Sequence, residues 1–147
     1  MNTDKDIATL NTLIATTIDS ADGYEQAAAT DNAGDLAQTF RQFASERRSI
    51  VAELRGHVVR LGGNPEDDGT LLAAAHRQFL NLRSAFDSDK RTAINEVERG
   101  EDYIKNKYEM ALKEDLAPDV RQAIQRAYES IRAGHDTFSA LKRSYAA

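Results

Sequence analysis

Apolar residues recur every three or four positions along most of the chain, which is the spacing of one face of an α-helix. Thr3 or Asp4 is expected to cap the first helix, and Gly62 followed by Gly63 marks the end of the second. No alternating pattern typical of strands is present, so the chain is predicted to be all-α. The predicted helices cover about residues 4–29, 36–62, 88–117 and 118–141.

The connections between these helices predict how they are arranged. Short turns join the first helix to the second and the third to the fourth, so each pair is expected to be antiparallel. The connection over residues 63–88 is much longer and contains a short amphipathic stretch from Leu71 to Phe86. A connection of this length can cross the bundle and let the third helix start at the same end as the second. We therefore expect a ferritin-like four-helix bundle, in one domain over residues 1–147, with a long crossover containing a short helix.

Composition narrows the class of partner and of chemistry. The chain has 19 Lys and Arg against 24 Asp and Glu, a formal charge of −5, so neither nucleic acid nor a membrane is expected as a partner. With no cysteine, disulfides and thiolate chemistry are excluded. No nucleotide-binding motif occurs, and the amino terminus carries no apolar leader, so a cytoplasmic protein is expected. The partly apolar residues 71–82 favour a homodimer that covers them.

Several polar side chains fall on or beside the apolar faces of the predicted helices. Glu101 lies near the centre of the stripe of the third helix, with Glu98 on its flank, and His135 lies inside the stripe of the fourth, where it is expected to face Glu101. On the second helix Arg47 is near the middle of the apolar face and Glu46 at its margin. Four tyrosines are interpreted as rim residues, with one of them nearest the core: Tyr24, Tyr103, Tyr128 and, nearest the core, Tyr108.

This polar layer has two interpretations. Glu46, Glu98, Glu101 and His135 could hold a metal ion such as Fe, Mn or Zn, because these cations bind carboxylate oxygen and imidazole. Alternatively, Arg47 neutralises one of the inward carboxylates and His135 donates to the other, which leaves a satisfied ionic network without metal. The position of Arg47, where a cation would otherwise be needed, favours the second interpretation.

Four stretches of the chain resemble a bacterial ferritin-like four-helix-bundle family of unknown function. They are LNTLIATTIDSADGYEQAA in the first helix, ERRSIVAELRGHVVRLGGNPEDDGTLLAAAHR, ERGEDYIKNKYEMAL in the third helix and GHDTFSALK in the fourth. LGGNP with the following HR, and ERGED at residues 98–102, are the more specific parts of the likeness. The resemblance implies a ferritin-like bundle with the crossover described above, in a family with no established activity.

The chain departs from di-iron carboxylate bundles in its ligand motifs. Those proteins use Glu-x-x-His on two helices, whereas Glu46 is followed three residues later by Ser49, and His135 is preceded three residues earlier by Arg132. We therefore expect a non-enzymatic or only vestigially metal-binding bundle, with a stress or metal-handling role by analogy alone. A divergent di-metal (iron or manganese) carboxylate oxidase or peroxide scavenger, and a self-associating structural or interaction protein, remain as alternatives.

Overall fold

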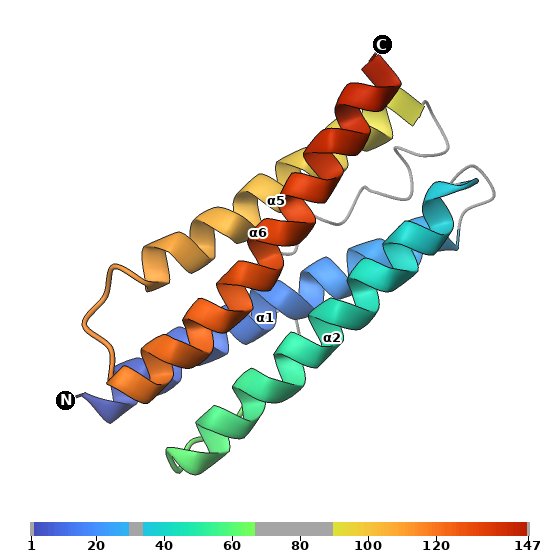
Figure 1. The fold of residues 1–147 in the computed structure, drawn as a ribbon. Helices are drawn as coiled ribbons and strands as arrows, with labels where there is room; N and C mark the ends of the chain where they lie inside the picture. Colours follow the sequence, from blue (N-terminus) through green and yellow to red (C-terminus); the bar gives the residue numbers. More distant parts are fainter. Residues whose placement is uncertain (1, 30–33, 67–89, 147) are drawn as a thin grey trace.

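Four long α-helices make up the computed structural model, which describes residues 2–29, 34–66 and 90–146. No strand occurs within these ranges, so the all-α prediction is confirmed for them. The crossover helix predicted between Leu71 and Phe86, and the apolar segment on which the homodimer prediction rests, lie outside the described residues. The helices are α1 (Thr3–Ala28), α2 (Leu36–Arg60), α5 (Lys90–Ala111) and α6 (Pro118–Ala146) (Figure 1).

The ends of α1 and α2 are set by local chemistry. The side chain of Asn2 accepts a hydrogen bond from the amide of Lys5 at 3.0 Å, so Asn2 caps α1 in place of the predicted Thr3 or Asp4. α2 ends where Gly62 adopts a φ of +83°, a left-handed conformation that costs glycine little. The predicted stop at this glycine is therefore confirmed.

The turn after α2 is fastened to α1. A Cβ atom on Gly63 would lie 2.9 Å from side-chain atoms of Ile7, so a glycine is needed for this close approach. Asn11 of α1 donates to the carbonyl of Asn64 at 3.0 Å and accepts from the amide of Glu66 at 2.8 Å. These bonds hold the residues after α2 against α1.

Neighbouring helices in the bundle run antiparallel. Thr9 and Tyr24 of α1 bond to Glu114 and Glu101 respectively, so α1 and α5 run in opposite directions. α1 also packs against α2, and α6 packs against α2 and α5. Consequently α2 and α5 run in the same direction, from the same end of the molecule (Figure 1). No helix among the described residues combines the length and apolar character needed to cross a bilayer.

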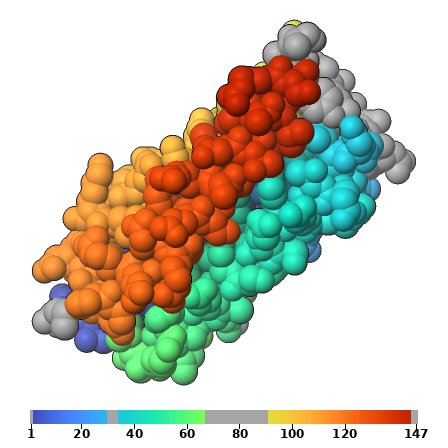
Figure 2. Space-filling view, viewed as in Figure 1, coloured from blue at the N-terminus to red at the C-terminus, as the bar shows by residue number. Residues whose placement is uncertain are grey.

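The buried apolar residues form two clusters, one in each half of the elongated bundle. In the first cluster, the residues nearest the middle of the bundle are one from each of α1, α2, α5 and α6: Ile18, Ile50, Ile104 and Ile131. The second cluster contains most of the buried aromatic rings. Its residues nearest the middle, on the same four helices, are Tyr24, Ala44, Val97 and Phe138. The candidate site lies between the two clusters. α2 and α6 lie side by side over this level on the face shown in Figure 2.

Candidate functional site

A buried ion pair lies between the two apolar clusters. The Arg47 guanidinium of α2 donates from Nη1 to Glu101 Oε2 and from Nη2 to Glu101 Oε1, both at 2.9 Å. Their side chains are only 2% and 1% exposed. Two parallel charge-assisted bonds of this kind fix the orientation of both groups as well as their distance. The pair therefore ties α2 to α5 across the centre of the bundle.

Two side chains of α1 complete the hydrogen bonding of this pair. Ser20 Oγ accepts from Arg47 Nη1 at 2.6 Å, and the Tyr24 hydroxyl donates to Glu101 Oε2 at 2.6 Å. The guanidinium carbon also lies 5.6 Å from the centre of the Tyr24 ring. Burial of a charge is tolerated only where such partners replace water, and this network supplies them to both ions.

A glycine on α6 makes room for the guanidinium. A Cβ atom on Gly134 would lie 2.9 Å from Arg47 Nη2 and 3.6 Å from Glu101 Oε1. The first distance is shorter than the separation of two atoms in ordinary contact. Gly134 therefore adds α6 to the helices that form the layer, and all four helices meet there.

Burial and the charges in this layer shift the pKa of Tyr24 and of Arg47. Burial, and then the charge of Glu101, raise the pKa of Tyr24 well above its ordinary value, so the phenol stays a hydrogen-bond donor. Burial alone lowers the pKa of Arg47, but the charge and hydrogen bonds of Glu101 outweigh this effect and raise it. The layer is thus an ionised pair held by a neutral tyrosine.

A second polar contact lies one level away along α1. Thr17 donates to the carbonyl of Leu13 at 2.7 Å, and its oxygen lies 2.7 Å from the Tyr108 hydroxyl. Because the threonine proton is used on Leu13, Tyr108 is the donor between the two hydroxyls. Burial raises the pKa of Tyr108 to about 12. Tyr24 is 2% exposed and Tyr108 is fully buried, so the prediction that these two tyrosines are rim residues is wrong, although Tyr108 was expected to lie nearest the core.

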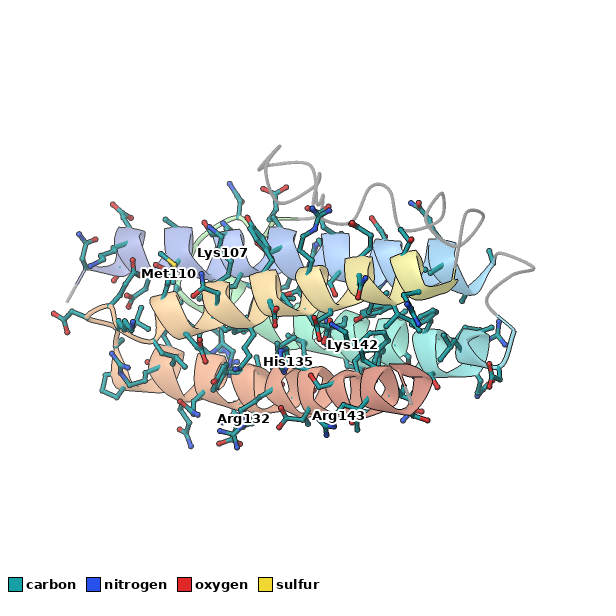
Figure 3. The ribbon with its side chains drawn as sticks, turned by 90° about the horizontal axis from the view of Figure 1, so that it is seen from above. Lys107, Met110, Arg132, His135, Lys142 and Arg143 are labelled. Atoms are coloured by element: carbon teal, nitrogen blue, oxygen red, sulfur yellow. The ribbon has the colours of Figure 1, made fainter. Side chains whose placement is uncertain are left out.

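The predicted contact between His135 and Glu101 does not form. His135, labelled in Figure 3, lies on α6 beside α5. Its Nε2 lies 2.6 Å from Asp102 Oδ1, and its Nδ1 lies 3.4 Å from Asp136 Oδ1. Its side chain is 17% exposed, on the flank of α6 that borders α5. His135 follows Gly134 by one residue, and one residue turns a helix by about 100°, which carries the imidazole out of the buried layer.

The other two predicted ligands also lie away from Glu101. Glu98 bonds to Lys142 at 2.6 Å on the partly exposed seam of α5 and α6, and Glu46 is exposed on α2 beside Gln42. Of the four side chains predicted to bind metal, only Glu101 is in the buried layer. Within the described ranges, no three His, Asp or Glu side chains gather in a way that could hold a metal ion.

Three members of the layer were not expected from the sequence: Ser20, Tyr24 and Gly134. The first two continue a polar series of α1 that begins at Thr17, with steps of three and four residues. That spacing keeps Thr17, Ser20 and Tyr24 on one helix face and is the signal that could have found them. Gly134 left no such signal, because it has no side chain to contribute to a hydrophobic pattern.

The fold and site together define an all-helical bundle with a buried ionic layer at mid-length. The chain belongs to the family described as a domain of unknown function (DUF2383), which matches residues 5–114. The match covers α1, α2 and α5 and therefore includes Ser20, Tyr24, Arg47 and Glu101, while Gly134 on α6 lies beyond it. No curated protein matches the chain.

Proposed function

We propose that this chain is a ferritin-like bundle that works as a non-enzymatic structural or interaction protein. The observation that carries the proposal is the bidentate ion pair between Arg47 and Glu101, with both side chains almost completely buried. In a carboxylate-bridged metal bundle, inward carboxylates are neutralised by the metal ions. Here the positive charge beside Glu101 comes from a side chain of the protein itself.

The surroundings of the pair support a structural role over a catalytic one. A reacting group has to reach its substrate, and oxygen chemistry at a di-metal centre needs open coordination positions. Glu101 has both carboxylate oxygens bonded to Arg47, and one of them also to Tyr24. The layer is thus filled by its own hydrogen bonds.

The ferritin-like assignment is supported by the directions of the helices. A bundle with antiparallel neighbours in which the second and third long helices run in the same direction is the one-crossover arrangement of ferritin-like proteins. α2 and α5 have this relation (Figure 1). The likeness of the sequence to the ferritin-like family supports the same assignment.

The ion pair gives the bundle a defined register. Apolar side chains pack acceptably in several alignments, whereas a bidentate pair is satisfied in one, and a buried polar group can specify register for that reason. Ser20, Arg47, Glu101 and Gly134 set one such level on the four helices. A rigid bundle of this kind suits a protein that presents its surface to a partner.

The substitution Glu101→Gln tests the proposal against the metal-site alternative. Gln leaves Arg47 buried without its counter-charge, a loss of about 3–5 kcal/mol. We expect the melting temperature of the variant to fall by the same amount with and without added Fe(II), Mn(II) or Zn(II). Glu98→Gln is the matched control, because Glu98 pairs with a partly exposed lysine and its loss should cost about 1 kcal/mol or less.

A metal site predicts a different pattern for the same variants. The apoprotein would lose little stability on Glu101→Gln, because one carboxylate less relieves repulsion, while the stabilisation that metal gives the parent would shrink. That pattern would overturn the proposal. Oxygen consumption by metal-loaded parent protein would also overturn it.

A further inference from the structure

A small cleft opens to solvent between α1 and α5, away from the ionic layer. Its volume is about 190 Å³. This is below the roughly 300–1,000 Å³ of a pocket for a drug-sized ligand. Its occupant must therefore be a small molecule. Figure 3 shows Lys107 and Met110 at this edge of α5, on the side that faces α1.

One end of the cleft carries the ammonium group of Lys107. The Lys107 ammonium lies over the Tyr103 ring, 5.4 Å from its centre, and the lysine is half-buried. In the described part of the chain, Lys107 forms no ion pair with a carboxylate. A half-buried cation held in place by an aromatic ring is ready to accept an anionic group.

The other end carries a carboxylate. Glu114 accepts a hydrogen bond from Thr9 Oγ1 of α1 at 2.7 Å, which holds its carboxylate against α1 at the edge of the cleft. An ionised carboxylate can accept several hydrogen bonds, so it retains capacity for a donor from a ligand. Lys107 lies in the last two turns of α5, whereas Glu114 lies in the turn that follows Ala111, so the two charges come from different parts of the cleft wall.

The surface between the two charges is apolar. Leu13 and Ala111 are almost fully buried beneath the cleft. Met110 forms its wall and is 52% exposed, one of two large hydrophobic side chains that are exposed in the described ranges. The flexible thioether of methionine adapts to short alkyl chains of different shape.

We propose that this cleft binds a short ω-amino carboxylate. The ligand carboxylate pairs with Lys107, its methylene chain lies along Leu13, Ala111 and Met110, and its ammonium pairs with Glu114. A zwitterion with charges at both ends of an alkyl chain matches all three parts of the cleft. A simple fatty acid would leave its apolar end beside the Glu114 carboxylate, and a simple amine would place its apolar end beside Lys107.

The methionine methyl groups provide a direct measurement of binding. The chain has two methionines, Met1 and Met110, so methyl-labelled methionine gives two NMR signals and the Met110 signal reports on the cleft. Titration with ε-aminocaproate should shift the Met110 signal to saturation and leave the Met1 signal in place. Caproate and pentylamine, which each lack one charge, should bind about fivefold more weakly, the value of one partly exposed ion pair.

Charge-removing variants locate the two ends of the ligand. Lys107→Gln should weaken ε-aminocaproate binding about fivefold and leave pentylamine binding unchanged, whereas Glu114→Gln should weaken pentylamine and leave caproate unchanged. Lys105→Gln and Glu109→Gln are matched controls, because these residues pair with each other outside the cleft, and both should bind as the parent does.

Three results would overturn the proposal. The first is a Met110 signal that does not move with ε-aminocaproate. The second is equal affinity for ε-aminocaproate, caproate and pentylamine, which would indicate nonspecific binding to an apolar surface. The third is parent-like binding by both Lys107→Gln and Glu114→Gln.

Discussion

The role of Gly134 gives a prediction that opposes the usual effect of glycine in a helix. Replacing a glycine in a helix by alanine ordinarily stabilises a protein by about 1 kcal/mol. At Gly134 the new Cβ atom would lie 2.9 Å from Arg47 Nη2, and the guanidinium is held on its other side by Glu101 and Ser20. The guanidinium must therefore move and give up its bond to Glu101 Oε1.

The lost hydrogen bond costs more free energy than the gain in helix propensity returns, so Gly134→Ala is predicted to destabilise the protein. Loss of one hydrogen bond between charged groups costs about 1.5–3 kcal/mol, against the gain of about 1 kcal/mol in helix propensity. Gly134→Ala should therefore lower the free energy of unfolding by about 0.5–2 kcal/mol, and the melting temperature by about 2–6 °C. Urea titration followed by far-ultraviolet circular dichroism measures both the free energy and its denaturant dependence.

Gly56 provides the matched control within the same molecule. It lies in α2, and a Cβ atom there would meet no atom within 4 Å. Gly56→Ala should therefore stabilise the bundle by about 1 kcal/mol. If Gly134→Ala stabilises the protein as Gly56→Ala does, the guanidinium does not rest against Gly134 and the described layer is wrong.

Three further predictions follow from single contacts. Burial raises the pKa of Tyr108 to about 12, so in the unfolded chain this phenol loses its proton at a lower pH than in the folded protein. The free energy of unfolding should therefore fall as pH rises from about 10 to 12, and it should fall less steeply in Tyr108→Phe. Arg47→Met should cost about 3–5 kcal/mol by leaving Glu101 unpaired, whereas the double variant Arg47→Met/Glu101→Met should recover most of this loss in a melting experiment. Asn11→Ala should cost about 1 kcal/mol and speed hydrogen exchange at the Glu66 amide, which bonds to the Asn11 side chain.

The helices were predictable because their signals are local. Helical spacing of apolar residues, the glycine at 62 and the proline at 118 place the described helices to within a few residues, apart from the ends of α5 and α6. α5 stops at Ala111, and Arg121 donates to the carbonyls of Leu112 and Glu114 just beyond it. This support comes from the next helix and could not be read from the α5 sequence.

The ionic layer was predictable in part. Arg47 and Glu101 lie at the centres of strong apolar stripes, so their burial follows from helical geometry. At the level of the ionic layer, the residue at the centre of the buried face of α6 is Gly134. Because glycine adds nothing to a hydrophobic pattern, the buried position was assigned to its polar neighbour His135 instead. A helical projection also cannot tell which of two nearby carboxylates, Glu98 or Glu101, Arg47 meets.

If Arg47 supplies the positive charge beside Glu101, the bundle needs no metal ion at this level. Elemental analysis of protein purified without chelator and passed through gel filtration measures whether metal is bound. The ion pair predicts Fe, Mn and Zn far below one equivalent per chain, in protein that is fully folded. One or two equivalents of metal retained per chain, and lost in Glu101→Gln, would contradict it.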